Sequence, residues 1–252
     1  MMSSRRKGRE SEMNLKGKRV VVTGGGSGYG RGIAAELAKA GAKVWITGRD
    51  ARKLAAAAKA TGAKAVVADV TSGADWDRVL DEVGAIDVLV NNAGAGGRIA
   101  PLAKQSDLEI ESVIATNLTG ALLGCRRAAK RMIARKKGGA IVNVSSVCAL
   151  YAWPGWGVYT AAKAGLSKFS HALYAELRPH GIRVTCVTPS WGRTGFNVAA
   201  GIRGASEDRA LAKLCIQPED LGRIVRGILE QPDRLAVPDV TVQPMIQDIV
   251  PM

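Results

Sequence analysis

Short runs of β-branched and other apolar residues alternate along this chain with longer stretches in which apolar residues recur at helical spacing. The short runs predict strands at residues 19–23, 43–47, 65–68, 87–90, 140–144, 183–188 and 240–242. The longer stretches predict helices at 33–40, 51–60, 75–83, 159–178 and 218–230, and one from 106–117 that runs on toward residue 135. The sequence therefore predicts a regular succession of strand and helix.

The strand runs are apolar throughout instead of alternating with polar residues, which is typical of strands covered on both faces. Strand–helix alternation favours a parallel sheet with right-handed crossovers. We therefore expect an α/β fold, a doubly wound, Rossmann-like parallel sheet with helices on both faces. No internal repeat or linker divides residues 15–252, so we expect a single domain there, preceded by a disordered basic tail at 1–14.

The chain of 252 residues carries a formal net charge of +14, with basic residues spread over its whole length. Because they form no stripe interleaved with aromatic residues, nucleic-acid binding is not predicted, and a general attraction to anions is the simpler interpretation. Four widely spaced cysteines and two histidines predict reduced thiols and no metal site. No apolar run has the length of a membrane span and no signal peptide is present, so we expect a cytoplasmic protein.

A glycine-rich segment, TGGGSGYG at residues 23–30, lies between the first predicted strand and the first predicted helix. Glycines at such a turn allow backbone N–H groups and a helix N-terminus to approach a pyrophosphate. The spacing is not G-x-G-x-x-G, because Ile33 stands where the third glycine would be. The segment by itself also fits a purely structural turn, but its place after the first strand favours dinucleotide binding.

The end of the second predicted strand bears on the choice of dinucleotide. A carboxylate there would accept hydrogen bonds from the ribose 2′-hydroxyl of NAD(H) and repel a 2′-phosphate. This chain has Gly48 and Arg49 instead, and a guanidinium pairs with a phosphate through two hydrogen bonds. We therefore expect NADP(H) to be favoured over NAD(H). The alternative is that Arg49 is an ordinary exposed arginine.

Tyr159 and Lys163 stand four residues apart in a predicted helix, which places a phenol and an ammonium on one face. Reduction of a ketone by hydride transfer needs a proton donor near the developing oxygen charge, and a nearby cation favours the phenolate form of tyrosine. The Y-x-x-x-K spacing alone is a weak signal. Ser146 lies thirteen residues upstream, directly after the fifth predicted strand.

Together these motifs resemble those of the short-chain dehydrogenase/reductase family, and the resemblance runs from about residue 15 to the C-terminus. The resemblance implies an oxidoreductase that interconverts a ketone and a secondary alcohol with NADP(H). Besides the glycine-rich segment and the serine–tyrosine–lysine set, it rests on Asp69-Val70 after the third strand, Asn91-Asn92-Ala93-Gly94 after the fourth and Pro189-Ser190-Trp191-Gly192-Arg193-Thr194 after the sixth.

The resemblance also implies roles for individual residues. Tyr159 would be the general acid/base, Ser146 would hydrogen-bond the substrate oxygen, and Lys163 would lower the pKa of the tyrosine and hold the nicotinamide ribose. Asn117 matches the helix asparagine that supports the lysine through water, while Ser145 is expected to be structural. The expected cofactor-binding set is Thr23, Gly24, Ser27, Gly28, Tyr29, Gly30, Arg49, Asp69, Val70, Asn92, Ala93, Gly94, Tyr159, Lys163, Pro189, Gly192 and Thr194.

Three features depart from the family pattern. Tyr29 occupies a place where isoleucine is common, and Ser190 follows Pro189 where glycine is usual. The C-terminus lacks the Asp-Gly-Gly ending of many members and reads VTVQP at residues 240–244. These departures do not involve the expected catalytic residues. They do weaken any inference of this protein's substrate from the substrate of one subfamily.

Aromatic residues near the expected nicotinamide site bear on the substrate. Trp153, Trp156 and Trp191 lie on loop segments with proline and glycine, so we expect them to line the pocket together with Phe196. The segment 195–215 contains several glycines and is expected to act as a lid. These features predict an apolar or cyclic ketone or secondary alcohol as substrate.

Two other functions stay open on the sequence. A 3-oxoacyl-acyl-carrier-protein reductase would act on a thioester carried by an acidic partner, which suits the net positive charge. A non-catalytic dinucleotide-sensing protein would bind the cofactor without turnover, although the complete set of Asn117, Ser146, Tyr159 and Lys163 argues against it. By resemblance the chain is expected to form a homo-oligomer, a dimer or a homotetramer, through helices near 106–130 and 159–178.

Overall fold

The computed structural model describes residues 14–202 and 208–248, so the predicted tail, apart from residue 14, and residues 203–207 of the predicted lid lie outside it. In the described part, seven strands form one sheet with every neighbouring pair parallel, in the order β3-β2-β1-β4-β5-β6-β7. The strands are β1 (Arg19–Thr23), β2 (Lys43–Gly48), β3 (Lys64–Val67), β4 (Val88–Asn91), β5 (Gly139–Val144), β6 (Ile182–Pro189) and β7 (Asp239–Val242).

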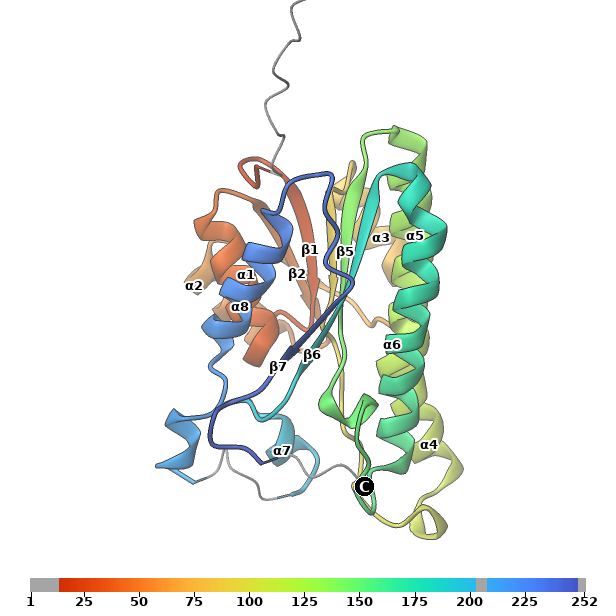
Figure 1. The fold of residues 1–252 in the computed structure, drawn as a ribbon, viewed down its shortest axis with the longest axis vertical. Coiled ribbons are helices and arrows are strands. Elements are labelled where there is room, and N and C mark those ends of the chain that lie inside the picture. The colour runs from red at the N-terminus through yellow and green to blue at the C-terminus, as the bar shows by residue number, and fades with distance from the viewer. Residues whose placement is uncertain (1–13, 203–207, 249–252) are drawn as a thin grey trace, which may run out of the picture.

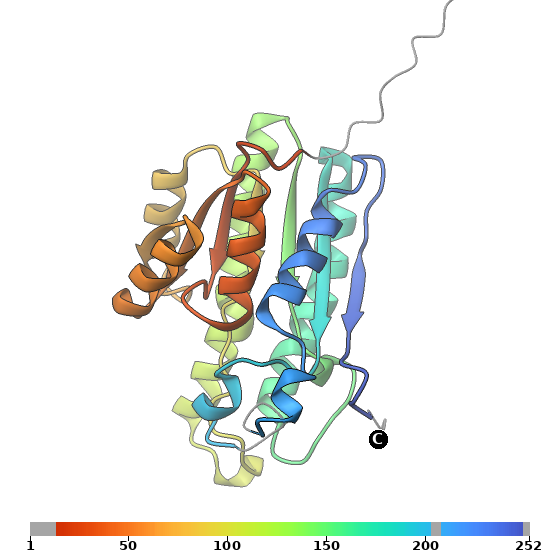
Figure 2. The ribbon, with the colours of Figure 1, turned by 90° about the vertical axis from the view of Figure 1, so that its left-hand side faces the viewer.

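Helices cover both faces of the sheet (Figures 1 and 2). One face carries α1 (Gly28–Lys39), α2 (Ala51–Thr61) and α8 (Pro218–Leu229), and the other carries α3 (Gly73–Val83), α5 (Gly120–Arg135) and α6 (Gly157–Leu177). Two shorter helices, α4 (Asp107–Ile114) and α7 (Phe196–Ala199), lie toward the lower end of the molecule in Figure 1. The predicted doubly wound α/β fold is confirmed. A search of the described helices finds none with the length and apolar character of a membrane span.

The apolar strand residues alternate between the two faces of the sheet. Val20 and Val22 belong to the apolar cluster with α1 and α8, whereas Val21 belongs to the cluster with α3, α5 and α6. All three side chains are fully buried. Successive side chains of a strand point to opposite faces, so a strand covered on both sides must be apolar at every position. This requirement explains why the strand runs in the sequence lack polar alternation.

Helix α1 begins earlier than the apolar pattern predicted, at Gly28 instead of residue 33. The residue before it, Ser27, is extended, and Gly28 has a positive φ of 49°. Apolar periodicity does not reveal this start, because the first helical turn is made by the last part of the glycine-rich segment. The N-terminus of α1 therefore lies within the turn where we expected a pyrophosphate to bind.

The long helix predicted from residue 106 toward 135 is interrupted. Helix α4 ends at Ile114 and α5 starts at Gly120, and Ala115–Thr119 between them form a π-helical turn. Such turns are rare and are frequent at functional sites. Asn117 lies in the middle of this turn, so the irregularity coincides with an expected site residue.

The strand order places two turns side by side at the carboxyl ends of β1 and β4. The chain leaves β1 toward α1 on one face of the sheet, and it leaves β4 toward α4 and then α5, which covers the other face. Connections that leave neighbouring strands toward opposite faces open a crevice between them, where ligands bind in doubly wound sheets. This end of the sheet points toward α7 in Figure 1.

Two glycines provide a matched test of the packing between α1 and α8. A Cβ at Gly32 of α1 would overlap the backbone carbonyl of Pro218, whereas a Cβ at Gly227 of α8 would meet no atom within 4 Å. We expect Gly32→Ala to lower the free energy of unfolding by about 1–3 kcal/mol, because the two helices must move apart. Gly227→Ala is expected to raise it by about 0.5–1 kcal/mol through helix propensity. Urea unfolding checks both, and equal effects would contradict the close packing.

Candidate active site

Hydrogen bonds tie the turn after β1 to the turn after β4. The buried hydroxyl oxygen of Thr23 accepts from the backbone N–H groups of Asn92 (3.0 Å) and Ala93 (2.9 Å). The side-chain amide of Asn92 donates in return to the carbonyl oxygen of Thr23 (2.9 Å). These bonds fix the two turns against each other at the crevice between β1 and β4.

Close contact between the two turns requires glycine at two positions. Gly24 has a φ of 65°, in the left-handed region that favours glycine. A Cβ at Gly30 would overlap the carbonyl oxygen of Gly24 and would come within 2.5 Å of Asn92 Nδ2. Part of the glycine pattern therefore serves backbone packing. The same packing leaves the first turn of α1 beside the crevice.

Tyr159 and Lys163 lie one turn apart on α6, and both side chains are buried. The Lys163 ammonium donates to the carbonyl oxygen of Val144, the last residue of β5, at 2.9 Å. Its Nζ lies 5.8 Å from the centre of the Tyr159 ring. The helical spacing thus brings the phenol and the ammonium together, and the lysine also joins α6 to the sheet.

Burial governs the protonation of both groups. Desolvation raises the pKa of the Tyr159 phenol above its usual range, the Cys148 thiol adds to this, and a hydrogen bond with Ser146 opposes it. Desolvation also lowers the pKa of Lys163 to about 8, so the ammonium form still prevails at pH 7. The net shift of the tyrosine pKa is upward, because the phenol is removed from water. The expected lowering of this pKa by the lysine stays a prediction.

Asn117 is buried beside the lysine and is held by three hydrogen bonds. Its amide nitrogen donates to the carbonyl oxygens of Ala95 (2.7 Å) and Val113 (2.9 Å), and its oxygen accepts from the backbone N–H of Ala95 (3.2 Å). A Cβ on Gly94 would lie 2.8 Å from Asn117 Oδ1 and 3.4 Å from Lys163 Nζ. The π-helical turn, the turn after β4 and the lysine therefore meet at one point.

The two serines after β5 differ in their contacts. The buried Ser145 hydroxyl bonds to the carbonyl oxygen of Lys163 (3.1 Å) and to the hydroxyl of Ser167 (2.7 Å), both on α6, which fits the expected structural role. The Ser146 hydroxyl oxygen accepts from the backbone N–H of Cys148 (3.2 Å) and shares a hydrogen bond with Tyr159. Ser146 is therefore the serine that contacts the phenol.

A cavity of about 360 Å³ has Tyr159, Lys163 and Ser146 in its wall. Trp156 stacks on Phe196 with ring centres 6.2 Å apart, and both rings pack against the Tyr159 ring at 5.8 and 5.3 Å. Trp153 and Trp191 line the same cavity, and Trp191 is 43% exposed. All four aromatic residues that we expected in the pocket are therefore part of its wall.

The other expected cofactor-binding residues fall into two groups. One group lies near the cavity, which is lined by Tyr29, Asn92, Gly94, Pro189, Gly192 and Thr194. The second group follows the outer strands: Asp69 and Val70 come after β3, and the carboxylate of Asp69 accepts from the backbone N–H of Thr71 (2.9 Å). Arg49 follows β2, and its exposed side chain makes no hydrogen bond or ion pair with any described residue. Its guanidinium is therefore available to an anion.

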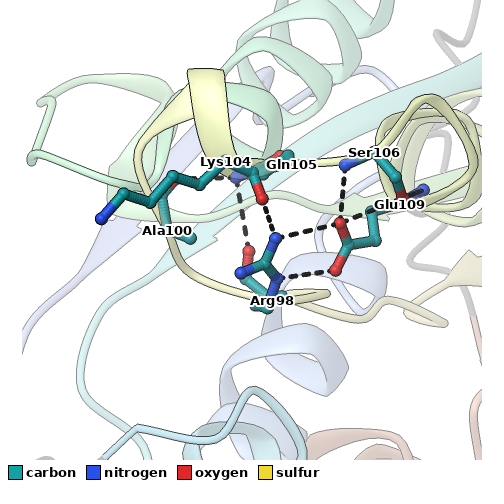
Figure 3. Close-up of polar contacts among 6 residues, drawn as sticks. All are labelled: Arg98, Ala100, Lys104, Gln105, Ser106 and Glu109. Atoms are coloured by element: carbon teal, nitrogen blue, oxygen red, sulfur yellow. Dashed lines mark hydrogen bonds and ion pairs between the residues drawn. The ribbon is translucent and has the colours of Figure 1, made fainter.

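The loop after β4, residues 95–106, is held by one arginine (Figure 3). The guanidinium of Arg98 donates to both carboxylate oxygens of Glu109, at 2.7 and 3.2 Å, and to the carbonyl oxygen of Lys104. Glu109 also accepts from the backbone N–H of Ser106 (2.7 Å) and so caps α4. The Arg98 guanidinium and this cap lower the pKa of Glu109 to about 2, so the ion pair persists down to strongly acidic pH.

The same loop supports the aromatic wall of the cavity. A Cβ at Gly96 would lie 2.9 Å from the ring of Phe196, which shows that the loop backbone packs directly on that ring. The Arg98–Glu109 pair is exposed to solvent, and exposed ion pairs contribute little to global stability. The pair therefore orders a loop that supports the cavity wall more than it stabilises the fold.

Sequence reasoning missed the polar wall residue Gln247, which lies beyond β7, and it covered Asn197 only as part of the expected lid at residues 195–215. The position of Gln247 depends on how the C-terminal segment returns past β6, and no spacing or composition signal reveals that path.

A search of the described residues for metal ligands finds no group of three or more His, Cys, Asp or Glu placed to hold an ion. The four cysteines are buried and form no disulfide, and burial raises the pKa of Cys125 to about 12.

Comparison with known proteins connects this geometry to a family and to characterised relatives. The model of a family described as short chain dehydrogenase matches residues 18–201. The chain is 37% identical to 3beta-hydroxysteroid dehydrogenase 1 of Eggerthella lenta over 194 residues, which cover 73% of this chain and 74% of that protein.

Two solved structures extend the comparison to the whole fold. The closed form of serine dehydrogenase complexed with NADP+ is 29% identical with a TM-score of 0.83, covering 92% of this chain and 97% of that one. A 3-ketoacyl-(acyl-carrier-protein) reductase from Brucella melitensis complexed with NADH is 29% identical with a TM-score of 0.81, covering 92% and 98%. The fold is therefore shared with dinucleotide-binding dehydrogenases and reductases.

Arg98 provides a test of how the loop is held. In Arg98→Ala we expect backbone amides of residues 96–105 to exchange hydrogen about 2–10-fold faster, because the loop loses its bonds to Glu109 and Lys104. The unfolding midpoint should move by less than about 2 °C, since the pair is exposed. Arg223→Ala, which removes a comparable exposed pair with Asp220 on α8, is the control and should leave loop exchange unchanged. Unaltered exchange in Arg98→Ala would show that other contacts order the loop.

Proposed function

The chain belongs to the short-chain dehydrogenase family, and from this premise we propose that it interconverts a ketone and a secondary alcohol with NADP(H), with Tyr159 as general acid/base. Membership establishes an oxidoreductase of the alcohol dehydrogenase type. The proposal for this site is carried by one observation. The buried phenol of Tyr159 contacts Ser146 and lies one helical turn from Lys163, in the wall of an aromatic cavity.

The proposed reaction delivers a hydride and a proton to the two atoms of a carbonyl group. When held in the crevice between β1 and β4, a dihydronicotinamide would supply the hydride that the carbonyl carbon needs. Ser146 donates a hydrogen bond to the carbonyl oxygen and stabilises the negative charge that develops there. Tyr159 transfers its phenolic proton to the same oxygen, which completes the alcohol. In the opposite direction, the Tyr159 phenolate removes the hydroxyl proton of the alcohol.

The protonation of the site suits the reductive direction. The raised pKa of Tyr159 keeps the proton on the phenol at neutral pH until charge develops on the carbonyl oxygen. Lys163 has a pKa of about 8 and is still charged at pH 7, so it stabilises the phenolate that remains after transfer. Val144 and Asn117 act as positioning residues, because Val144 accepts from the ammonium and Asn117 lies beside it.

Three features support the fit of a dinucleotide to the crevice between β1 and β4. Backbone atoms of Gly24 and Gly30 pack so closely that no Cβ fits at Gly30, and the first turn of α1 lies beside them. Thr194 and Gly192 lie at the cavity, where the resemblance assigns the nicotinamide carboxamide. The Arg49 guanidinium is exposed and unpaired among the described residues, which favours a 2′-phosphate. On the same grounds we propose that the other residues of the expected cofactor-binding set also contact the dinucleotide.

The aromatic wall supports an apolar or cyclic ketone as the substrate class, because Trp153, Trp156 and Phe196 offer flat apolar surfaces beside the phenol. A 3-oxoacyl-carrier-protein reductase is the second candidate. The net charge of +14 and the likeness to the Brucella reductase favour it. Turnover of acyl thioesters in preference to ketones would select that alternative.

We also propose that the chain forms a homo-oligomer, a dimer or tetramer, through α5 and α6. These helices form an outer layer of the molecule (Figure 1). Leu122, Leu123 and Ile133 of α5 line an open apolar groove together with Phe169 and Leu173 of α6. Contact with a second copy would remove this surface from water.

Arg49 tests the proposed preference for NADP(H). In Arg49→Ala we expect the dissociation constant of NADPH to rise about 10–100-fold, because charged hydrogen bonds to the 2′-phosphate are lost. The dissociation constant of NADH should change less than about 2-fold. Arg178→Ala, an exposed arginine beyond the end of α6, is the control. Fluorescence titration measures the dissociation constants of both dinucleotides for the wild type and the two variants, and an equal loss for both dinucleotides in Arg49→Ala would contradict the role of Arg49.

Tyr159 tests the proposed chemistry. We expect Tyr159→Phe to lower kcat for ketone reduction about 10²–10⁴-fold, because the proton donor is lost while the ring still fills its place. Binding of NADPH should persist, which separates an enzyme from a dinucleotide sensor. Tyr174→Phe on the same helix removes a phenol that packs against the core and should retain activity. Steady-state kinetics with a panel of ketones measures kcat for both variants. Full activity in Tyr159→Phe would exclude the general acid/base role of Tyr159.

A further inference from the structure

Two of the departures from the family pattern, Tyr29 and Ser190, meet in the structure with Gln247. Tyr29 lies at the start of α1, Ser190 directly after β6, and Gln247 beyond β7. The Tyr29 hydroxyl donates to the carbonyl oxygen of Ser190 (3.3 Å), and the Ser190 hydroxyl donates to Gln247 Oε1. All three residues line the cavity that contains Tyr159. Their proximity indicates one local feature of this chain.

The contacts of Gln247 determine which way its amide faces. The backbone N–H of Trp191 lies 3.3 Å from Gln247 Oε1, and a backbone N–H is able only to donate. The amide atom that faces Ser190 and Trp191 must therefore be the oxygen. The NH₂ group of Gln247 then carries two donors that have no partner among residues 14–202 and 208–248.

The wall that holds this amide is supported from behind. The Tyr29 side chain packs so tightly against Gly192 that a Cβ there would overlap the phenol. Tyr29 is half-buried, and its hydroxyl holds the Ser190 carbonyl. The segment Ser190–Gly192 is therefore fixed between the first turn of α1 and the C-terminal segment. The Gln247 amide is bonded to this segment and is therefore preorganised, so little order has to be gained when an acceptor binds.

Resting on the proposed ketone–alcohol activity, we propose that Gln247 is a specificity-determining residue. Its NH₂ group donates a hydrogen bond to an oxygen, a hydroxyl or a carbonyl, that the substrate carries away from the reacting carbon. Trp153, Trp156 and Phe196 form an apolar part of the same cavity wall. A polar donor on Gln247 would therefore bind only the end of a cyclic substrate that carries an oxygen. The substrate class is thereby narrowed to cyclic ketones with a second oxygen.

The test compares two ketones of similar shape, 4-hydroxycyclohexanone and 4-methylcyclohexanone, with NADPH as reductant. The measured quantity is the ratio of their kcat/KM values. We expect Gln247→Leu to lower this ratio about 5–10-fold, mainly through a higher KM for the hydroxy ketone, because one hydrogen bond to the substrate is lost. The values for the methyl ketone should stay within about 2-fold, since leucine fills a similar volume. An unchanged ratio would overturn the proposal.

Two further variants separate a local effect from a general one. Met245→Ala alters the same segment at a fully exposed side chain and should leave the ratio unchanged. Ser190→Ala removes one of the two donors that orient the amide oxygen and should lower the ratio by less than Gln247→Leu does. If Met245→Ala lowers the ratio as much as Gln247→Leu, the C-terminal segment acts only as a cover, and the role of the amide is excluded.

Binding measurements distinguish failure of this inference from failure of the proposed function. Quenching of tryptophan fluorescence reports ketone binding in the presence of NADP+, with Tyr159→Phe as background so that no turnover occurs. Gln247→Leu in that background should weaken binding of the hydroxy ketone and not of the methyl ketone. If the wild type reduces neither ketone, the proposed activity fails, and this comparison still decides the role of Gln247. Weaker binding of NADPH with an unchanged ketone preference would assign the amide to the cofactor and overturn the inference.

Discussion

The burial of the Lys163 ammonium is the constraint on which the site depends. A charge removed from water is costly unless hydrogen bonds compensate for it, and here the carbonyl oxygen of Val144 supplies one at 2.9 Å. Val144 ends the strand that leads to Ser146, and Lys163 lies one turn from Tyr159 on α6. This hydrogen bond, together with those of Ser145 to α6, therefore sets the position of the phenol relative to Ser146. Sliding α6 along the sheet would leave a buried charge without its acceptor.

Two kinds of wall surround the cavity. The inner wall is formed by residues at the ends of β4, β5 and β6, and buried bonds such as those between Thr23 and Asn92 fix it to the turn after β1. The outer wall is formed by aromatic residues such as Phe196, which the loop held by Arg98 supports, and by the C-terminal segment that carries Gln247, where the contacts are more exposed. Chemical groups that need accurate geometry are best placed on the inner wall, which is rigid. Recognition of varied substrates is best placed on the outer wall.

The sequence predicted the strands well, because burial on both faces requires uninterrupted apolar runs such as Val20–Val22. It misplaced the start of α1, since the glycines from Gly28 onward carry no apolar pattern. It also gave no sign of the π-helical turn around Asn117, because the apolar pattern on both sides of that turn was interpreted as one continuous helix. The shift of the Tyr159 pKa depends on burial, and the contacts of Gln247 depend on how distant segments meet. Neither can be obtained from local spacing.

The strand order also affects how the protein reaches its folded state. Val20 of β1 pairs with Val88 of β4, so β2, β3 and three helices must be synthesised and accommodated before the crevice exists. Such long-range pairing has a high entropic cost and is slow to form. A dinucleotide that binds only the completed crevice would stabilise folded chains by mass action, by about 2.7 kcal/mol at a concentration of 100 times its dissociation constant. The nucleotide supply of the cell would then influence the yield of native protein as well as its rate of turnover.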